Sequence, residues 1–253
     1  MIPKLEISAL SYAYHTLGGE TQALSNISFS VAPGEFVAIV GPSGCGKSTL
    51  LSLFSGLLIP DEGDILIDGI PLPESKVNIG YMLQRDHLFE WRTILSNASL
   101  GLEIQHKSDI VHKQKLQELI EAYGLKHFAN SRPSELSGGM RQRAALIRTL
   151  ALEPDILLLD EPFSALDYQT RLSVCDDISS IIRSRKKTAI LITHDLSEAV
   201  STADRVIVLS RRPGTIKAIL PTPFSPPDLR PLERRHAPEF SGHFNKVWEI
   251  LQN

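Results

Sequence analysis

The sequence is short of cysteine and has no long apolar run. Only two of its 253 residues are cysteines, Cys45 and Cys175, and they lie far apart. A disulfide framework or a cysteine metal site is therefore not expected, and a reducing, cytosolic setting fits. The strongest apolar run, residues 156–159, falls far short of the roughly 20 residues that span a bilayer. We expect that this chain alone cannot cross a membrane.

The start of the chain and its charge exclude two further classes. No apolar stretch follows Lys4, so a secretory signal peptide is not expected. The net charge of -3 gives no general reason to expect nucleic-acid binding. Hydrophobic residues make up 42% and charged residues 22% of the chain, which is an ordinary globular balance. The length suits one large α/β domain with a smaller lobe inserted in it.

The first third of the chain is rich in predicted β-structure. Residues 5–7 and 27–31 alternate apolar and polar side chains, which is typical of half-buried antiparallel strands. Residues 36–40 form a continuous apolar run, which predicts a fully buried strand. A glycine-rich loop and a helix that begins near Lys47 follow directly, and residues 65–69 predict a return strand and turn.

Helices and buried strands alternate in the rest of the chain. Apolar residues between positions 108 and 123 fall on one helical face, and a second helix begins near Gly138 and stops before Pro154. Buried strands are predicted at 156–159 and 188–193. Strands that alternate with helices predict a parallel central sheet with crossover helices.

These patterns predict a single domain over residues 1–253. Its catalytic α/β core, with the β region, is expected at 1–84 and 154–220, and an inserted helical lobe at 85–153. A proline-rich link and an amphipathic helix occupy 221–253. We expect this helix to close the core with apolar residues at helical spacing: Phe240, Phe244, Val247, Trp248 and Leu251.

Residues 41–48 fit the phosphate-binding pattern G-x4-G-K-[ST] without a mismatch. The glycines let consecutive N–H groups face phosphate oxygens at the positive end of a helix. Lys47 supplies a charge for the β- and γ-phosphates, and the Ser48 hydroxyl ligates Mg²⁺. A glycine-rich turn with a chance lysine is the alternative, which the strand–loop–helix context disfavours. The expected nucleotide contacts are Gly41, Pro42, Ser43, Gly44, Cys45, Gly46, Lys47, Ser48 and Thr49.

Two predicted buried strands end in polar residues. Asp160 and Glu161 follow residues 156–159, and parallel strands present their carboxyl ends to the ligand crevice. We expect Asp160 to hold Mg²⁺ and Glu161 to polarise the attacking water as general base. His194 ends the next strand and is expected to contact the γ-phosphate and help to position the water. A solvated turn and a structural histidine are the alternatives.

Residues 136–143, Leu-Ser-Gly-Gly-Met-Arg-Gln-Arg, lie just upstream of the acidic strand. Ser137 followed by Gly138 and Gly139 at a helix start is a second anion site. Taken alone, this segment could be an ordinary helix cap. Together with the phosphate loop and the acidic strand, it resembles the signature motif of ABC ATPases. The resemblance runs through nearly the whole chain.

The resemblance implies a fold, ligands and a quaternary arrangement. The fold is α/β, a P-loop NTPase (RecA-like) parallel-sheet core with an N-terminal antiparallel β region and an inserted helical subdomain. The ligands are ATP and Mg²⁺. Two copies are implied to dock head to tail, so that each ATP lies between one phosphate loop and the partner copy's signature motif.

The resemblance also implies roles for further residues. Gln84 is similar to the Q-loop glutamine of the family, which ligates Mg²⁺ together with Ser48 and Asp160 and senses the transmembrane partner. Asp167 lies in a segment similar to the D-loop, which communicates across the dimer. Tyr14 aligns best with the aromatic residue that stacks on adenine, and Tyr12 is a second candidate because stacking needs only a π-face.

One position departs from the family pattern, because Met140 stands where many members have glutamine. The phosphate contacts come from Ser137 and the glycine backbone, so activity is expected to survive. With residues 209–214 and the tail near Pro238, this signature resembles the importer branch for nitrate, sulfonate, taurine and related small organics. Residues 88–91, Leu-Phe-Glu-Trp, could contact a transmembrane subunit or pack within the lobe.

The sequence therefore predicts an ATP-hydrolysing subunit that powers an ABC transporter, an importer of a solute of the nitrate, sulfonate, taurine or pyrimidine-precursor type. Its expected partners are transmembrane permease subunits, a second copy of itself and an extracytoplasmic solute-binding protein, with no nucleic acid. Its expected place is the cytoplasmic face of the cell membrane, as a peripheral protein. The alternative is a soluble ABC ATPase acting on nucleic acid or ribosomes, but the chain has neither a second cassette nor a long coiled-coil insertion.

Overall fold

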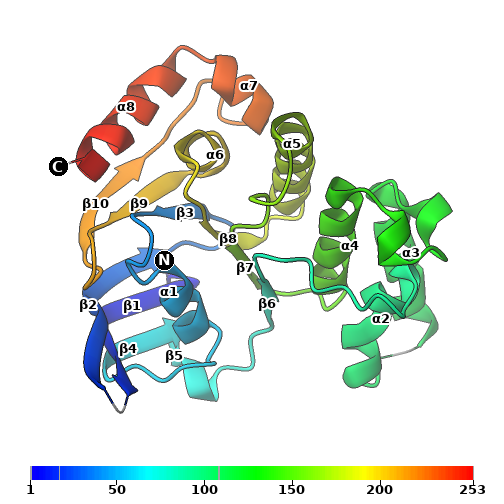
Figure 1. Cartoon of the computed structure of the whole chain (residues 1–253), viewed down its shortest axis with the longest axis horizontal. Helices are drawn as coiled ribbons and strands as arrows, with labels where there is room; N and C mark the ends of the chain where they lie inside the picture. The colour runs from blue at the N-terminus through cyan, green and yellow to red at the C-terminus, as the bar shows by residue number, and fades with distance from the viewer. Residues whose placement is uncertain (1, 17, 108, 253) are drawn as a thin grey trace. The chain divides into compact units, whose positions relative to one another are not determined.

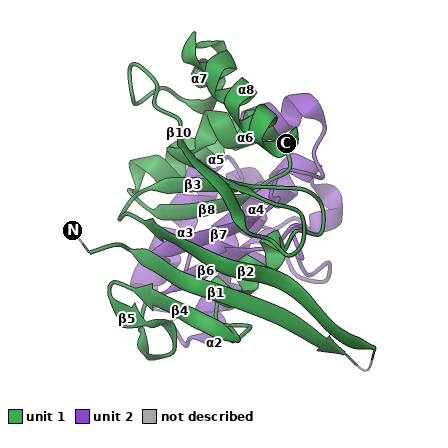
Figure 2. Cartoon of the chain, turned by 90° about the vertical axis from the view of Figure 1, so that its left-hand side faces the viewer, with its two compact units in different colours: residues 1–77, 175–253 green, residues 78–174 purple. Residues whose placement is uncertain are grey.

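The computed structural model of the chain describes residues 2–16, 18–107 and 109–252. Two compact units make up the chain, as Figure 2 shows in green and purple: unit 1 combines residues 1–77 and 175–253, and unit 2 is the continuous segment 78–174. The core, lobe and tail boundaries expected from the sequence stay a prediction. Among the described residues, no helix combines the length and apolar character needed to cross a bilayer.

The first sheet of unit 1 is antiparallel, in the strand order β2-β1-β4-β5 (Figure 1). Its strands are β1 (Leu5–Thr16), β2 (Gly19–Val31), β4 (Glu62–Ile67) and β5 (Ile70–Pro71). Leu5 pairs with Val31 on one side and Ile67 on the other, so the apolar positions of three strands share one face. Register shifts between Leu10 and Ala13 mark bulges in β1.

The second set of strands in unit 1 runs in the order β10-β9-β3-β8. Its members are β3 (Phe36–Val40), β8 (Thr188–Ile192), β9 (Arg205–Leu209) and β10 (Ile216–Pro221). β3 is parallel to both β8 and β9, and β10 is antiparallel to β9. Every residue of β3 and β8 is buried, as expected for continuous apolar runs in a parallel sheet.

Unit 1 also contains the helices α1 (Lys47–Phe54), α6 (Leu196–Thr202), α7 (Pro231–His236) and α8 (Glu239–Gln252) and the 3-10 turn η1 (Leu72–Glu74). α8 contacts α6, β9 and β10, and Val247 at its centre is fully buried. Buried Arg234 of α7 donates to the carbonyl oxygens of Leu229, Ala203 and Pro227. Burial lowers the pKa of Arg234 to about 10, so the guanidinium stays charged at neutral pH.

Unit 2 is mostly helical. It contains the parallel strands β6 (Ile79–Met82) and β7 (Ile156–Asp160), the helices α2 (Ile94–Ile104), α3 (Ile110–Ala122) and α4 (Gly138–Leu150), and the 3-10 turns η2 (Lys126–Phe128) and η3 (Pro133–Glu135). α5 (Tyr168–Ser184) begins in this unit and ends in unit 1. Thr93, Asp109 and Ser137 cap the N-termini of α2, α3 and α4. α4 contacts α2, α3 and β6.

Candidate functional site

The phosphate loop of unit 1 joins β3 to α1. Gly44 and Gly46 have φ angles of 74° and 100°, a left-handed region that favours glycine. Gly46 stands at the N-cap of α1, where no side chain caps the helix. A helix N-terminus without a side-chain cap is the arrangement that binds anions in proteins.

Lys47 folds back over this loop. Its Nζ donates to the carbonyl oxygens of Gly41 at 2.9 Å and Pro42 at 3.0 Å, and the side chain is almost buried. Burial raises the pKa of the Cys45 thiol, although Lys47 opposes the shift. The buried thiol therefore stays protonated and unreactive at neutral pH.

The backbone beneath the loop is packed so tightly that side chains are excluded. A Cβ on Gly46 would lie 2.6 Å from Leu24 Cδ2, and a Cβ on Gly214 would lie 2.2 Å from the Cys45 carbonyl oxygen. Gly214 itself is fixed, because its N–H donates to Ala23 at 2.8 Å and its carbonyl accepts from Ser25 at 3.0 Å. The turn after β9 therefore supports the phosphate loop from below.

The two tyrosines of β1 lie side by side. The rings of Tyr12 and Tyr14 meet edge to face, with centroids 5.0 Å apart and an interplanar angle of 88°. Tyr14 is 42% exposed, and its Oη lies 3.1 Å from Oγ1 of Thr49 in α1. Tyr14, the preferred candidate for stacking on adenine, therefore contacts α1, the helix that follows the phosphate loop.

His194 follows β8 on an exposed turn of unit 1. The residues around it are well anchored: Thr193 Oγ1 donates to Glu198 Oε2 at 2.8 Å, and Asp195 caps α6 by accepting from Ser197 and Glu198. His194 is therefore an exposed polar residue just beyond the carboxyl end of a buried parallel strand.

The acidic pair of unit 2 stands at the carboxyl end of β7. Asp160 is only 8% exposed, and its Oδ2 accepts from Tyr81 Oη at 3.4 Å. Glu161 adopts a φ of 44°, unusual for a non-glycine residue, and its Oε2 accepts from Gln84 Nε2 at 3.2 Å. The structure therefore brings together Gln84 and Glu161, which are 77 positions apart in the chain.

The signature segment of unit 2 begins α4. Ser137 Oγ accepts from Met140 N at 3.4 Å, and a Cβ on Gly139 would lie 2.7 Å from Thr170 Cγ2. A cavity of about 330 Å³ opens beside the exposed Ser137, and Met140 lines it. Asp167 accepts from Thr170 N at 3.1 Å, and hydrogen bonds from Thr170 lower the pKa of Asp167.

Residues 84–91 are tied to α4 by charged side chains. Arg141 pairs with Asp86 at 2.8 Å and Glu90 at 2.9 Å. Arg148 donates to the backbone oxygens of Asp86 and His87, both at 2.7 Å. Burial of the Asp86 carboxyl opposes ionisation, but hydrogen bonds from Arg141 and Leu88 outweigh it and lower the Asp86 pKa.

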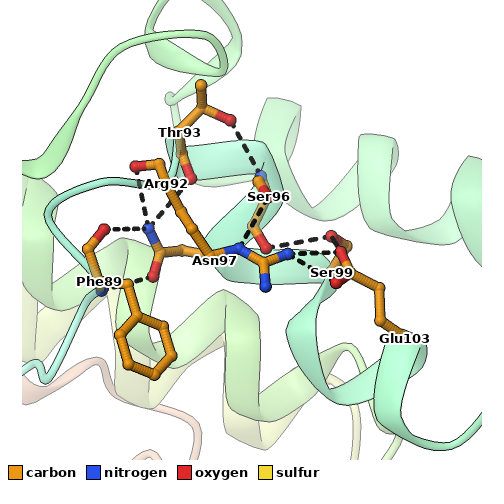
Figure 3. A network of polar contacts seen from close by, with 7 residues as sticks. All are labelled: Phe89, Arg92, Thr93, Ser96, Asn97, Ser99 and Glu103. Carbon is orange, nitrogen blue, oxygen red and sulfur yellow. Dashed lines mark hydrogen bonds and ion pairs between the residues drawn. The ribbon is translucent and has the colours of Figure 1, made fainter.

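Asn97 holds the next turn in place, as Figure 3 shows. Its Oδ1 accepts from Phe89 N at 2.7 Å, and its Nδ2 donates to the carbonyl oxygens of Phe89, Arg92 and Thr93 at 3.0 to 3.2 Å. Asn97 is fully buried, so water cannot reach its amide. These hydrogen bonds therefore satisfy the polar atoms that water would otherwise hydrate.

The sequence left two interpretations of residues 88–91 open, contact with a transmembrane subunit or packing within the lobe. The residues of this segment differ in their burial. Leu88 is buried, 6% exposed, and packs within unit 2, whereas Trp91 is 72% exposed. The Phe89 and Trp91 rings are in contact, with centroids 4.7 Å apart. A rigid turn therefore presents an aromatic side chain to the outside.

Comparison with known proteins settles the family. The ABC transporter family description matches residues 24–164, more than half of the chain. This chain belongs to the ABC transporter family. It is 42% identical to the uncharacterized ABC transporter ATP-binding protein YtlC of Bacillus subtilis, over 98% of this chain and 96% of that protein. It is 40% identical to the aliphatic sulfonates import ATP-binding protein SsuB of the same organism, over 92% and 93%.

Solved ABC cassettes share the fold. The ATP-binding cassette MJ0796, solved as a dimer bound to ADP and Pi, has a TM-score of 0.74 and 30% identity, covering 86% of this chain and 98% of the cassette. The protein cbiO1 of Clostridium perfringens, part of the transporter complex cbiONQ, has a TM-score of 0.78 and 28% identity, covering 88% and 90%. The predicted α/β P-loop fold is confirmed, and the chain is an ATP-binding, ATP-hydrolysing subunit of an ABC transporter.

In this ABC transporter subunit, sequence reasoning missed three supporting features. These are the backing of the phosphate loop by Gly214, the Thr49–Tyr14 contact, and the Asn97 network. Only Gly214 carried a signal, because Pro213-Gly214 is a typical turn dipeptide. The other two depend on pairings between distant segments, which a single sequence does not reveal.

Proposed function

We propose that Glu161 activates the attacking water during ATP hydrolysis. The observation that carries this proposal is the hydrogen bond between Gln84 and Glu161 at the carboxyl end of β7. The bond holds one carboxylate oxygen of Glu161 and orients the other, which suits a general base. His194 is proposed to contact the γ-phosphate, and Lys47 to leave its loop carbonyls for the phosphate oxygens when ATP binds.

We propose that Mg²⁺ enters the site together with ATP and that Ser48, Gln84 and Asp160 are its protein ligands. Hydroxyl, amide and carboxylate oxygens fit a hard cation that keeps water and phosphate in its shell. Within the described part of the chain, no three His, Cys, Asp or Glu side chains gather as a metal cluster. A metal held by a few protein oxygens and completed by phosphates fits this donor set. When bound, the ion neutralises phosphate charge.

Two copies of this chain are proposed to enclose ATP. Ser137 is exposed at the N-terminus of α4 beside an open cavity, so a phosphate from outside unit 2 could reach it. The dimers solved for the cassette MJ0796 support the proposal. Asp167 is proposed to communicate between copies, because its exposed turn follows the acidic strand.

The permease contact is proposed at Phe89 and Trp91. The exposed indole stands on a turn that the Asn97 network holds in one conformation, and a rigid aromatic residue is a typical anchor for a partner. The complex named for cbiO1 supports assembly of such cassettes with other subunits. The place that follows is the cytoplasmic face of a membrane, as a peripheral subunit.

Import of a small organic or inorganic solute is proposed as the transport reaction. The support is the family branch: SsuB proteins, named as aliphatic sulfonate importers, are 39–40% identical to this chain. An extracytoplasmic solute-binding protein would complete such an importer. Uptake of labelled alkanesulfonate, taurine and nitrate by vesicles that hold the full complex tests the solute class, with Lys47→Ala as the inactive control. ATP-dependent uptake of none of the three would contradict it.

The catalytic assignment is tested by Glu161→Gln. Amide in place of carboxylate removes the base but keeps the shape, so ATP should still bind while turnover falls by about 100-fold or more. The variant should accumulate as an ATP-bound dimer in gel filtration. Adding Ser137→Arg should return it to a monomer with normal ATP affinity. Unchanged turnover of Glu161→Gln would remove Glu161 from this role, and a dimer of the double variant would contradict the sandwich.

A further inference from the structure

The contact between Tyr14 and Thr49 joins two parts of unit 1 that bind different ends of a nucleotide. Tyr14 lies on β1, the strand that offers the aromatic ring, and Thr49 lies in the first turn of α1, directly after the phosphate loop. Their hydroxyl oxygens are 3.1 Å apart, and either can donate. Thr49 is only 8% exposed, so this hydrogen bond is partly shielded from water.

The Tyr14 ring is also restrained from the strand side. Tyr12 meets it edge to face at 5.0 Å, although both residues lie on the same bulged strand. Asp61, in the loop after α1, accepts from Ala13 N at 2.6 Å, between the two tyrosines. The backbone of β1 at Tyr14 is therefore fixed, and the remaining freedom of the ring is rotation of its side chain.

We infer that Thr49 is a positioning residue for the adenine platform: its hydroxyl, through that of Tyr14, holds the ring in the orientation that stacks on the base. This inference rests on the proposed nucleotide site. A ring that keeps its orientation before the ligand arrives loses less rotamer freedom on binding. Because Thr49 belongs to α1, the same bond sets the platform at a constant position relative to the phosphate loop.

The inference predicts different effects on binding of the base and on binding of the phosphates. Removing the Tyr14 hydroxyl should weaken binding of ATP, which has a base, and leave binding of inorganic tripolyphosphate unchanged, because it has none. The expected loss is about 2- to 10-fold in Kd, the range for one hydrogen bond without charge. Tyr14→Ala, which removes the ring itself, should weaken ATP binding by about 5- to 150-fold.

The experiment measures Kd for ATP and for tripolyphosphate by calorimetry with five forms of the full chain: wild type, Tyr14→Phe, Thr49→Val, Thr49→Ser and the double variant Tyr14→Phe/Thr49→Val. Tyr14→Phe should lose the expected factor for ATP alone, and Thr49→Val should lose at least the same factor for ATP. For ATP, the double variant should lose no more than Thr49→Val alone, since both substitutions remove one bond. Thr49→Ser keeps the hydroxyl and should restore wild-type affinity. Thermal unfolding confirms that each variant is folded.

Three results would overturn the inference. Wild-type affinity for ATP in Tyr14→Phe would show that the hydroxyl does not matter. Equal losses for ATP and tripolyphosphate in Tyr14→Phe would show that the bond acts on the phosphate loop and not on the base. Additive losses in the double variant would make the two residues independent. The proposed function is judged separately: wild type that binds neither ligand would contradict the nucleotide site itself, whereas wild type that binds ATP more tightly than tripolyphosphate leaves it standing.

Discussion

The phosphate loop and the segment 84–93 are both irregular and both adjoin a helix, yet they are held by different forces. Backbone contacts hold the phosphate loop, where Gly46 and Gly214 leave no room for a methyl group. Side chains hold the other segment, through Arg141, Arg148 and Asn97. Close backbone packing tolerates no added atom, whereas partly exposed ion pairs contribute little singly and can be exchanged. The first region is therefore sensitive to any added atom, whereas the second depends on individual side-chain bonds.

Gly214→Ala gives the largest expected effect. The new methyl group would meet the Cys45 carbonyl oxygen at 2.2 Å, so the phosphate loop must shift. Overpacking of this kind costs about 1–3 kcal/mol or more, and binding of both ATP and tripolyphosphate should weaken by up to about 100-fold. Calorimetry with both ligands checks it.

Gly242→Ala is the matched control for that change. Gly242 lies in α8, and nothing stands within 4 Å of its added Cβ. It should bind both ligands as the wild type does and be slightly more stable, because alanine favours helix. Wild-type affinity in Gly214→Ala would show that the phosphate loop can shift to accommodate the added methyl group. The phosphate loop would then not be more tightly constrained than the segment 84–93.

Asn97→Ala should have the next largest effect, on stability and not on nucleotide binding. It removes the acceptor of Phe89 N and a donor to the partly buried carbonyl oxygens of Phe89, Arg92 and Thr93, which costs about 1–3 kcal/mol. Urea unfolding should show this loss, while affinity for tripolyphosphate stays unchanged. Ser99→Ala is the control: its hydroxyl donates to Ser96 and to exposed Glu103, so about 1 kcal/mol or less is expected. A similar loss of unfolding free energy in both variants would show that Asn97 contributes no more than an ordinary side-chain hydrogen bond.

Asp86→Asn should have the smallest effect. The Asp86–Arg141 pair is partly exposed, so about 1 kcal/mol of unfolding free energy is expected from it at pH 7. Nucleotide affinity should not change. Glu121→Gln, in an exposed pair with Lys126, is the control and should have almost no effect.

The pH dependence of that difference has a defined sign. The folded Asp86 pKa lies below its ordinary value of 3.8, so the stabilisation is present above that value and is lost as the pH falls through the lower folded pKa. The stability difference between wild type and Asp86→Asn should therefore be constant from pH 7 to about pH 5 and vanish in stronger acid. A difference that grew on acidification would contradict the assigned ionisation.

Much of the fold could be predicted because its signals are local. The apolar run 36–40 and the glycine loop predicted β3 and the start of α1 at Lys47, and both are confirmed. The helix expected over 108–123 is observed as Ile110–Ala122. The roles of the site residues stay predictions, although Gln84 and Glu161 are in contact and His194 follows the carboxyl end of β8.

The sequence by itself determined the chemistry of this subunit. A phosphate loop, an acidic strand end and a signature segment are short patterns whose spacing reflects the geometry of one ligand, so they can be read without a fold. Only the tertiary structure decided what supports them: Gly214 beneath the phosphate loop, Thr49 against Tyr14, and Asn97 of α2 bonded to the turn before that helix. These contacts join segments that are distant in sequence or depend on which way a side chain turns, and packing alone selects among the many partners that composition allows.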